Sequence, residues 1–159
     1  MDAEVCVRVA EENDLALMVP LINQAFLVES FFIRGDRIDL DQLREHLRKG
    51  VLYVAELSGT IVGVIYVELR GERAYFGLLS VAPEFQGRGI ARRLITAVED
   101  YARQHACTHM DITVVDLRTE LLPLYNHLGY VEILRGPIRP EMESKVTQPC
   151  QFVHMAKRL

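Results

Sequence analysis

The residues best suited to chemistry gather around two glycines in the middle of this chain. The run Gln86-Gly87-Arg88-Gly89-Ile90-Ala91 follows a mostly apolar stretch, residues 74–81, which is typical of a buried strand. A long amphipathic helix is predicted to begin at once, because apolar residues recur at helical spacing from Ile90 onward. The first amides of a helix lack intrahelical partners, and glycines let an anion approach the backbone. Residues 86–91, with the charge of Arg88, are therefore predicted to bind a pyrophosphate, and Arg92 is a further candidate phosphate neighbour.

Other phosphate-binding motifs fit this run less well. A P-loop needs a Gly-Lys-Ser/Thr run, and a dinucleotide fingerprint needs a third glycine or alanine where Arg92 stands. The run instead resembles motif A of the GNAT acyltransferase superfamily, Gln/Arg-x-x-Gly-x-Gly/Ala, with Gln86, Gly89 and Ala91 in register. In that family the motif binds the pyrophosphate of acetyl-CoA. For these six residues alone, an ordinary glycine-containing turn is the alternative.

Two further stretches resemble the same family. Leu79-Ser80-Val81 is similar to the family's strand end, where backbone groups of Leu79 and Val81 would pair with the pantetheine arm. The amide of Val81 would polarise the thioester carbonyl. Residues 124–130 are similar to the late pattern Leu-Tyr-x-x-x-Gly-Phe/Tyr, in which Tyr125 would protonate the departing thiolate of CoA. A tyrosine that only packs on a short helix is the alternative for Tyr125.

The general base is harder to assign, because this chain departs from the family pattern. Many relatives carry a glutamate where this chain has Tyr75, so Glu68 on the preceding predicted strand is the nearest candidate. An exposed strand glutamate is the alternative for Glu68. His127 is a further candidate because histidine titrates near neutrality, but its place near Gly129 is typical of a helix end. A chain of waters could replace any single base. Arg118 stands where many relatives have an asparagine that contacts CoA. It could touch a phosphate, touch the acceptor or face solvent.

Alternation and helical spacing predict the elements that position these residues. Strands are expected at residues 5–9, 52–57, 61–69, 74–81, 110–115, 130–134 and 152–157, and helices near 15–26, 40–49, 90–103 and 117–128. Asn13 or Asp14 is predicted to cap the first helix, in which Pro20 marks either a late start or a kink, and Asp39 with Gln42 is predicted to cap the second. Glu99 is expected on the outer face of the third helix, paired with Arg103.

The order of these elements is also similar to GNAT proteins over nearly the whole chain. The resemblance implies a mixed α/β fold: a mostly antiparallel sheet of about seven strands with about four helices. A strand-helix-strand crossover predicts a parallel neighbour for residues 74–81, and the resemblance implies that the sheet splays between strands four and five. Residues 27–38 and the loop 135–150 are expected to contribute to the acceptor pocket.

Composition limits the class of protein. A chain of 159 residues, half of them hydrophobic, fits a single globular domain over residues 1–159. The formal net charge of −4 argues against a nucleic-acid binder and mildly favours a cationic substrate. Apolar runs stay short of a membrane span, and the acidic start at residues 1–4 does not resemble a signal peptide. Cys6, Cys107 and Cys150 lack metal-ligand spacing and favour reduced thiols in the cytoplasm.

The resemblance implies that the chain transfers an acetyl group from acetyl-CoA, with no metal, to the nitrogen of a small-molecule or peptide amine. A second subunit, as in a homodimer, is left open as a further part of the pocket. A non-catalytic acyl-CoA-binding or regulatory domain is the main alternative, because the usual strand-four glutamate is missing. A nucleotide-dependent enzyme is a third reading.

Overall fold

The computed structural model describes residues 4–159, so the start of the chain, on which the expected lack of a signal peptide depends, lies mostly outside the described residues. Within residues 4–159 the strands, in chain order, are β1 (Val5–Val9), β2 (Val51–Leu57), β3 (Thr60–Arg70), β4 (Arg73–Val81), β5 (His109–Val115), β6 (Val131–Gly136) and β7 (Phe152–Arg158). They form a seven-stranded sheet in the order β1-β2-β3-β4-β5-β7-β6. Of its strand pairs, β4 with β5 is parallel and the others are antiparallel. The predicted mixed, mostly antiparallel sheet is confirmed.

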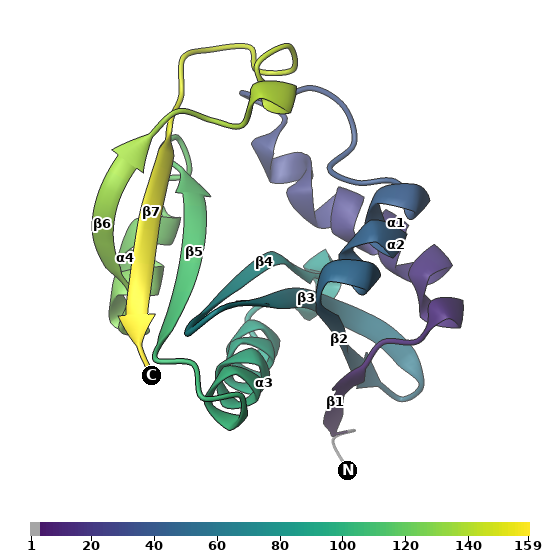
Figure 1. Ribbon diagram of the computed structural model, residues 1–159. Coiled ribbons are helices and arrows are strands. Elements are labelled where there is room, and N and C mark those ends of the chain that lie inside the picture. Colours follow the sequence, from purple (N-terminus) through teal and green to yellow (C-terminus); the bar gives the residue numbers. More distant parts are fainter. Residues whose placement is uncertain (1–3) are drawn as a thin grey trace.

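The α-helices of the described residues are α1 (Leu15–Ala25), α2 (Leu40–Lys49), α3 (Ile90–Gln104) and α4 (Leu121–His127). The helices belong to two hydrophobic cores, one on each face of the sheet. The helices α1 and α2 pack on one face, and α3 and α4 pack on the other (Figure 1). Each face of the sheet is therefore covered, which explains the long apolar runs of the central strands. The buried residues of β3 and β4 alternate between the two cores.

The sheet opens between β4 and β5, as predicted. The parallel pairing joins Arg73, Ala74 and Tyr75 to His109, Met110 and Asp111, and the two strands then diverge (Figure 1). Just beyond this point β4 carries an irregularity, because its register with β3 shifts between Val64 and Tyr66 and Leu78 adopts a positive φ of 56°. A bulge bends its strand and increases the local twist. The splay thus begins where β4 leaves regular pairing.

The helix starts follow from local hydrogen bonds, and Asp14 is the N-cap residue of α1, as expected, but without the expected side-chain bond. In α2 the Asp39 side chain accepts from the Gln42 amide at 2.8 Å, and the Gln42 side chain accepts from the Asp39 amide at 2.9 Å, so the predicted capping box is confirmed. At α1 the side chain of Asp14 makes no cap; it accepts from the Glu11 amide at 2.7 Å and from Arg8 instead. A 3₁₀ turn, Glu12–Asp14, leads into α1. Pro20 lies inside α1.

The expectation that Glu99 lies on the outer face of α3 is wrong. Its exposed fraction is 6%, and its carboxylate accepts from the Tyr130 hydroxyl at 2.8 Å and from Lys157 Nζ at 2.9 Å. Arg103 pairs with Asp100 at 3.0 Å instead. Glu99 lies beside the apolar stripe of α3, so partners from α4's C-terminal flank and from β7 can reach it in the core.

The loop that follows β6 is tied to the connection between α1 and α2. Ile33 forms a bridge with Val146, the Arg34 amide donates to the Lys145 carbonyl at 2.9 Å, and the Thr147 amide donates to the Phe32 carbonyl at 2.8 Å. Phe32 is fully buried in a small core with residues of β5 and β7. Both predicted pocket segments therefore lie together at one end of the sheet, although residues 39–134 separate them in sequence. Across residues 4–159, the helices fall short of the length and apolarity needed to cross a bilayer.

Candidate active site

The start of α3 has the geometry that its glycines predict. Gly87 and Gly89 both adopt a φ of +77°, and Gly89 is the N-cap of the helix. Within the described chain, no side chain donates to or accepts from this cap. L-residues with side chains rarely adopt this left-handed conformation, so glycine lets the chain turn sharply into the helix with its amides exposed. The arrangement can bind an anion such as a diphosphate.

The end of β4 leads directly to this helix start. The side-chain amide of Gln86 donates to the Val81 carbonyl at 3.3 Å, and the guanidinium carbon of Arg88 lies 5.1 Å from the centre of the Phe85 ring. Because β5 has already diverged, residues 76–81 of β4 have a neighbouring strand, β3, on one side only. The backbone groups on the other side of Leu79, Ser80 and Val81 face the splay, where an extended ligand arm can pair with them.

Tyr125 lies on α4 at the wall of the splay. Its ring centre is 6.2 Å from that of Phe76 on β4, and its exposed fraction is 7%. Burial raises the pKa of its phenol to about 12, with Arg118 opposing and Tyr75 adding to the shift. The hydroxyl therefore stays protonated at neutral pH and can act only as a proton donor.

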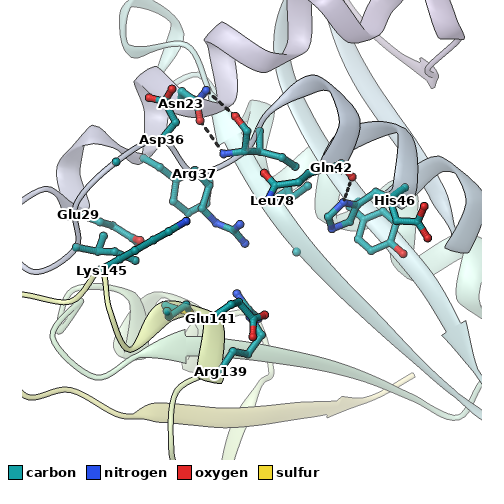
Figure 2. A pocket seen from close by; sticks show the side chains of 18 of the residues that line it. Asn23, Glu29, Asp36, Arg37, Gln42, His46, Leu78, Arg139, Glu141 and Lys145 are labelled. Carbon is teal, nitrogen blue, oxygen red and sulfur yellow. Dashed lines mark hydrogen bonds and ion pairs between the residues drawn. The ribbon is translucent and has the colours of Figure 1, made fainter.

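A cavity of about 820 Å³ opens on the face of β4 that α1 and α2 cover. Tyr75, Gly77 and Leu78 of β4 form one wall, residues 26–38 and α2 form the next, and the loop after β6 supplies the third (Figure 2). A Cβ atom added to Gly77 would lie 2.8 Å from the Tyr75 hydroxyl, so the missing side chain leaves room for this phenol. The cavity and the splay thus share strand β4.

Glu68 faces this cavity and is not the exposed strand residue of the alternative interpretation. Its carboxylate accepts from the Tyr66 hydroxyl at 2.6 Å and pairs with Arg70. Burial acts to raise the pKa of Glu68, but the hydrogen bonds from Tyr66 and Arg70 outweigh it, so the pKa lies below its usual value. On β4 its direct neighbour is Tyr75, the residue that replaces the family glutamate. Glu68 is therefore an ionised acceptor whose lone pairs are already partly used.

His46 is a residue of the cavity that sequence reasoning missed. Its Nδ1 lies 2.8 Å from the Gln42 carbonyl, and its ring meets the Tyr66 ring edge-on at 4.6 Å. A carbonyl only accepts, so Nδ1 carries the proton and Nε2 keeps its lone pair in the neutral ring. Burial is the main cause that lowers the pKa of His46. The sequence offers one clue, because His46 lies one turn after Gln42 on the same face of a capped helix.

Arg118 does not face solvent, which is one of the alternatives for it. Its guanidinium binds Glu29 at 2.8 Å and Glu120 at 2.6 Å, and 14% of its side chain is exposed. The expectation that it faces solvent is wrong, since it joins the segment before α4 to the connection after α1. Burial raises the pKa of Glu29 despite this ion pair.

The candidate residues thus fall into two groups on either side of β4. Leu79–Val81, residues 86–91 and Tyr125 belong to the splay, whereas Glu68 belongs to the cavity with His46 and Tyr75. His127 ends α4 and is exposed, as expected of a helix end. Arg92 is exposed in the first turn of α3. In the part of the chain that the structure describes, no cluster of three or more His, Cys, Asp or Glu residues could hold a metal ion.

A splayed mixed sheet, with a glycine-lined helix start at the end of the central strand, defines the class of coenzyme A-dependent acyltransferases. The model of the acetyltransferase (GNAT) family matches residues 19–130, well over half of the chain. The chain belongs to this family, and it is an acetyltransferase with acetyl-CoA as its co-substrate.

Solved structures of the same fold agree with this assignment. The ribosomal-protein-S18-alanine N-acetyltransferase of Escherichia coli aligns with a TM-score of 0.79 at 13% identity, over 98% of this chain and 94% of that one. The ribosomal-protein-alanine N-acetyltransferase of Brucella melitensis aligns with a TM-score of 0.76 at 21% identity, over 97% and 99%. The protein yncA of Salmonella typhimurium, solved with its cofactor acetyl-CoA, aligns with a TM-score of 0.73 at 19% identity, over 98% and 94%. At these identities the likeness shows the fold.

Proposed function

We propose that this protein transfers the acetyl group of acetyl-CoA directly to the nitrogen of an amine that binds in the cavity beside β4. The observation that carries this proposal is the placement of β4 between two open spaces. One side leads to the free helix start at Gly89, and the other side opens into the cavity. A ternary complex needs such an arrangement, because donor and acceptor must meet at one strand.

In this proposal the coenzyme lies along the splay. Residues 86–91 and Arg88 bind the diphosphate, and Arg92 in the first turn of α3 is its further neighbour. Leu79, Ser80 and Val81 pair with the pantetheine arm through their backbone groups. The Val81 amide polarises the thioester carbonyl, in the manner of an oxyanion hole.

The amine nitrogen attacks the thioester carbon, so a C–N bond forms while the C–S bond breaks. Tyr125 donates its proton to the departing thiolate, and its placement beside Phe76 at the wall of the splay supports this role. A free thiol has a pKa of about 8.5, below that of the buried phenol. The transfer therefore depends on the thiolate being as poorly solvated as Tyr125, because burial raises the pKa of both groups.

The proton that the amine loses goes to the cavity side. Glu68 is one candidate acceptor, since it is ionised and its β4 neighbour is Tyr75, although Tyr66 and Arg70 already bind its carboxylate. His46 is a second candidate, because its Nε2 lone pair is not engaged by the Gln42 contact. Either group can act directly or through water.

Two measurements test the proposal. Calorimetry with acetyl-CoA should show binding, and thiol release with a panel of amines should show turnover. We expect Tyr125→Phe to keep coenzyme affinity and to lower kcat by about 100-fold, the lower range for a lost general acid. Binding without turnover on any amine would support the regulatory domain instead, and a lack of binding to CoA would overturn the proposal. An unchanged kcat in Tyr125→Phe across pH would remove the acid role alone.

We also infer a single domain over the whole chain and a location in the cytoplasm. All three cysteines are free thiols, and Cys107 is buried, which suits a reducing compartment.

A further inference from the structure

The cavity beside β4 contains more positive charge than its acidic residues neutralise. Five carboxylates line it. Four of them are in ion pairs: Glu29 with Arg118 at 2.8 Å, Glu45 with Arg48 at 2.9 Å, Glu68 with Arg70, and Glu141 with Arg139 at 3.4 Å. The fifth, Asp36, is exposed to solvent. The cavity walls nevertheless also carry Arg34, Arg37, Lys49 and Lys145. The local charge therefore differs from the formal net charge of −4 for the chain, which alone would favour a cationic substrate.

Arg37 is the most telling of these cations. Within residues 4–159 its guanidinium has neither an ion-pair partner nor a hydrogen-bond acceptor, and its side chain is only partly exposed. Its guanidinium carbon lies 5.3 Å from the centre of the Phe26 ring. Figure 2 shows the guanidinium pointing into the cavity, while the carboxylate of the adjacent Asp36 turns away from it. Burial, with the nearby charge of Arg139, lowers the pKa of Arg37. A buried charge without a partner is costly, so a partner should come from a ligand.

The segment that carries Arg37 is held firmly in place. The side-chain amide of Asn23 on α1 donates to the Ile38 carbonyl and accepts from the Ile38 amide, both at 2.9 Å. Ile38 itself is buried. The backbone beside Arg37 is therefore fixed, and the Phe26 ring is the neighbour of its guanidinium.

Arg139 faces Arg37 from the opposite wall (Figure 2). It lies over the Phe152 ring at 5.2 Å, and its contact with Glu141 is long and largely exposed. Two guanidinium groups across one cavity repel each other unless an anion lies between them. Guanidinium groups suit carboxylates and phosphates, because their N–H groups form paired hydrogen bonds with two oxygens.

We propose that the acceptor is an amine that also carries an anionic group, a carboxylate or a phosphate-like group, held between Arg37 and Arg139 while its nitrogen points to β4. Free amino acids, each of which carries an α-carboxylate beside its amine, are the simplest compounds of this kind. This inference rests on the proposed function, because it names the substrate class of the same cavity.

The first experiment compares matched acceptors. For each amino acid, thiol release from acetyl-CoA is measured with the free acid, its α-amide and its decarboxylated amine, and an aminoalkylphosphonate series tests the phosphate-like group. The α-amide has the more readily deprotonated amine, so nucleophilicity alone would favour it. We expect an anionic series to be preferred by about 10- to 100-fold in kcat/KM, the range for a charge-assisted hydrogen bond. Equal or faster turnover of the uncharged amines would overturn the proposal.

Arg37→Gln should abolish this preference. The matched control is Arg103→Gln, an exposed arginine on α3 at the other face of the sheet, which pairs with Asp100. We expect Arg37→Gln to lose the preference through a higher KM for the anionic acceptor. The control should behave like the wild type. An identical preference in all three proteins would contradict the role of Arg37.

A binding measurement separates this inference from the proposed function. Inorganic phosphate is titrated into each of the three proteins by calorimetry, with the coenzyme site saturated by CoA so that the start of α3 cannot bind the phosphate. We expect binding to be at least tenfold weaker in Arg37→Gln than in the wild type and Arg103→Gln. If no amine is acetylated, the proposed function fails, and the phosphate titration still decides whether Arg37 forms an anion site. Equal phosphate affinity in all three proteins would overturn that site.

Discussion

Two polar clusters on opposite faces of the sheet differ in whether their charges are balanced. On the α3 face, Glu99 accepts from the buried Tyr130 at 2.8 Å and from the partly exposed Lys157 at 2.9 Å. On the other face, Arg37 and Arg139 approach one open cavity, and Arg37 has no partner among the described residues. A balanced buried cluster stabilises the fold, whereas an unbalanced one is suited to a ligand.

The balanced cluster explains why a carboxylate can lie in the core. Burial and the contact with Glu99 raise the pKa of Tyr130, so its hydroxyl remains a donor at any ordinary pH. Lys157 supplies the opposite charge, and its aliphatic stem lies against Gly129 at the end of α4. Glu99 thus joins α3 to β7 and to Tyr130, which lies between α4 and β6.

Removing the acid of the balanced cluster should have the largest effect on stability. Glu99→Ala leaves the Tyr130 hydroxyl unpaired in the core and Lys157 without its counter-charge. We expect the free energy of unfolding to fall by about 3 kcal/mol, the lower range for breaking a buried ion pair. Chemical denaturation measures this change.

The next residue in α3 provides the control. Asp100→Ala breaks a solvent-exposed pair with Arg103 and should cost less than about 0.5 kcal/mol. Equal losses in the two variants would show that the Glu99 cluster is not a core element.

The helix start at Gly89 is a second site whose polar groups lack a side-chain partner among the described residues. The effect of a side chain at Gly89 can be compared with its effect at a glycine elsewhere. Gly89 and Gly59 have φ values of +77° and +80°, and at both an added Cβ meets no atom within 4 Å. Alanine should therefore strain both positions equally, by about 1–2 kcal/mol. We expect only Gly89→Ala also to weaken CoA binding, by about tenfold, because its methyl group would meet the diphosphate.

Calorimetry with CoA on both glycine variants gives the answer. A similar loss of affinity in Gly59→Ala, which lies in the β2–β3 turn, would mean that strain alone weakens binding. Unchanged affinity in Gly89→Ala would argue against the proposed diphosphate site.

Much of the fold could be predicted because its signals are local. The Ser58-Gly59 turn adopts positive φ at both residues, as a two-residue hairpin requires, and the capping box of Asp39 and Gln42 forms as expected. The glycines before Ile90 also mark the start of α3 correctly. Each of these features depends on residues within a few positions of one another.

The features that were missed depend on residues far apart in the chain. Glu99 meets a tyrosine 31 residues later and a lysine 58 residues later, which helical spacing does not reveal. Arg37 and Arg139 meet only because the loop after β6 bridges to the segment after α1. The bulge at Leu78 was missed for another reason: its positive φ is adopted by a leucine, and no glycine at that position indicates it.

The cavity's own acid–base groups allow a sharper test on the unbalanced side. Nε2 of His46 can accept a proton, whereas the Glu68 carboxylate is already bound by Tyr66 and Arg70. We therefore expect His46→Gln to lower kcat/KM by about tenfold, less than the usual loss of a general base because water can partly replace the ring, and Glu68→Gln to lower it less.

The pH profile distinguishes these two groups. Because burial lowers the pKa of His46, a rate that needs the neutral ring should fall only as the pH drops below about 6.5, the usual histidine value. His46→Gln should remove this acidic limb, while Glu68→Gln should keep it. A larger loss in Glu68→Gln, with the limb intact in His46→Gln, would make Glu68 the base.

The smallest expected effect completes the comparison of the two clusters. Arg37→Leu removes an unpaired charge and keeps an apolar stem against Phe26, so the protein without ligand should lose no stability. We expect the free energy of unfolding to stay within about 0.5 kcal/mol of the wild type or to rise, since no partner is orphaned. Phosphate should stabilise the CoA-saturated wild type against denaturant, because a ligand that binds only the folded state raises its stability, and should not stabilise the variant. A loss of several kcal/mol in Arg37→Leu, as expected for Glu99→Ala, would mean that both clusters serve the fold.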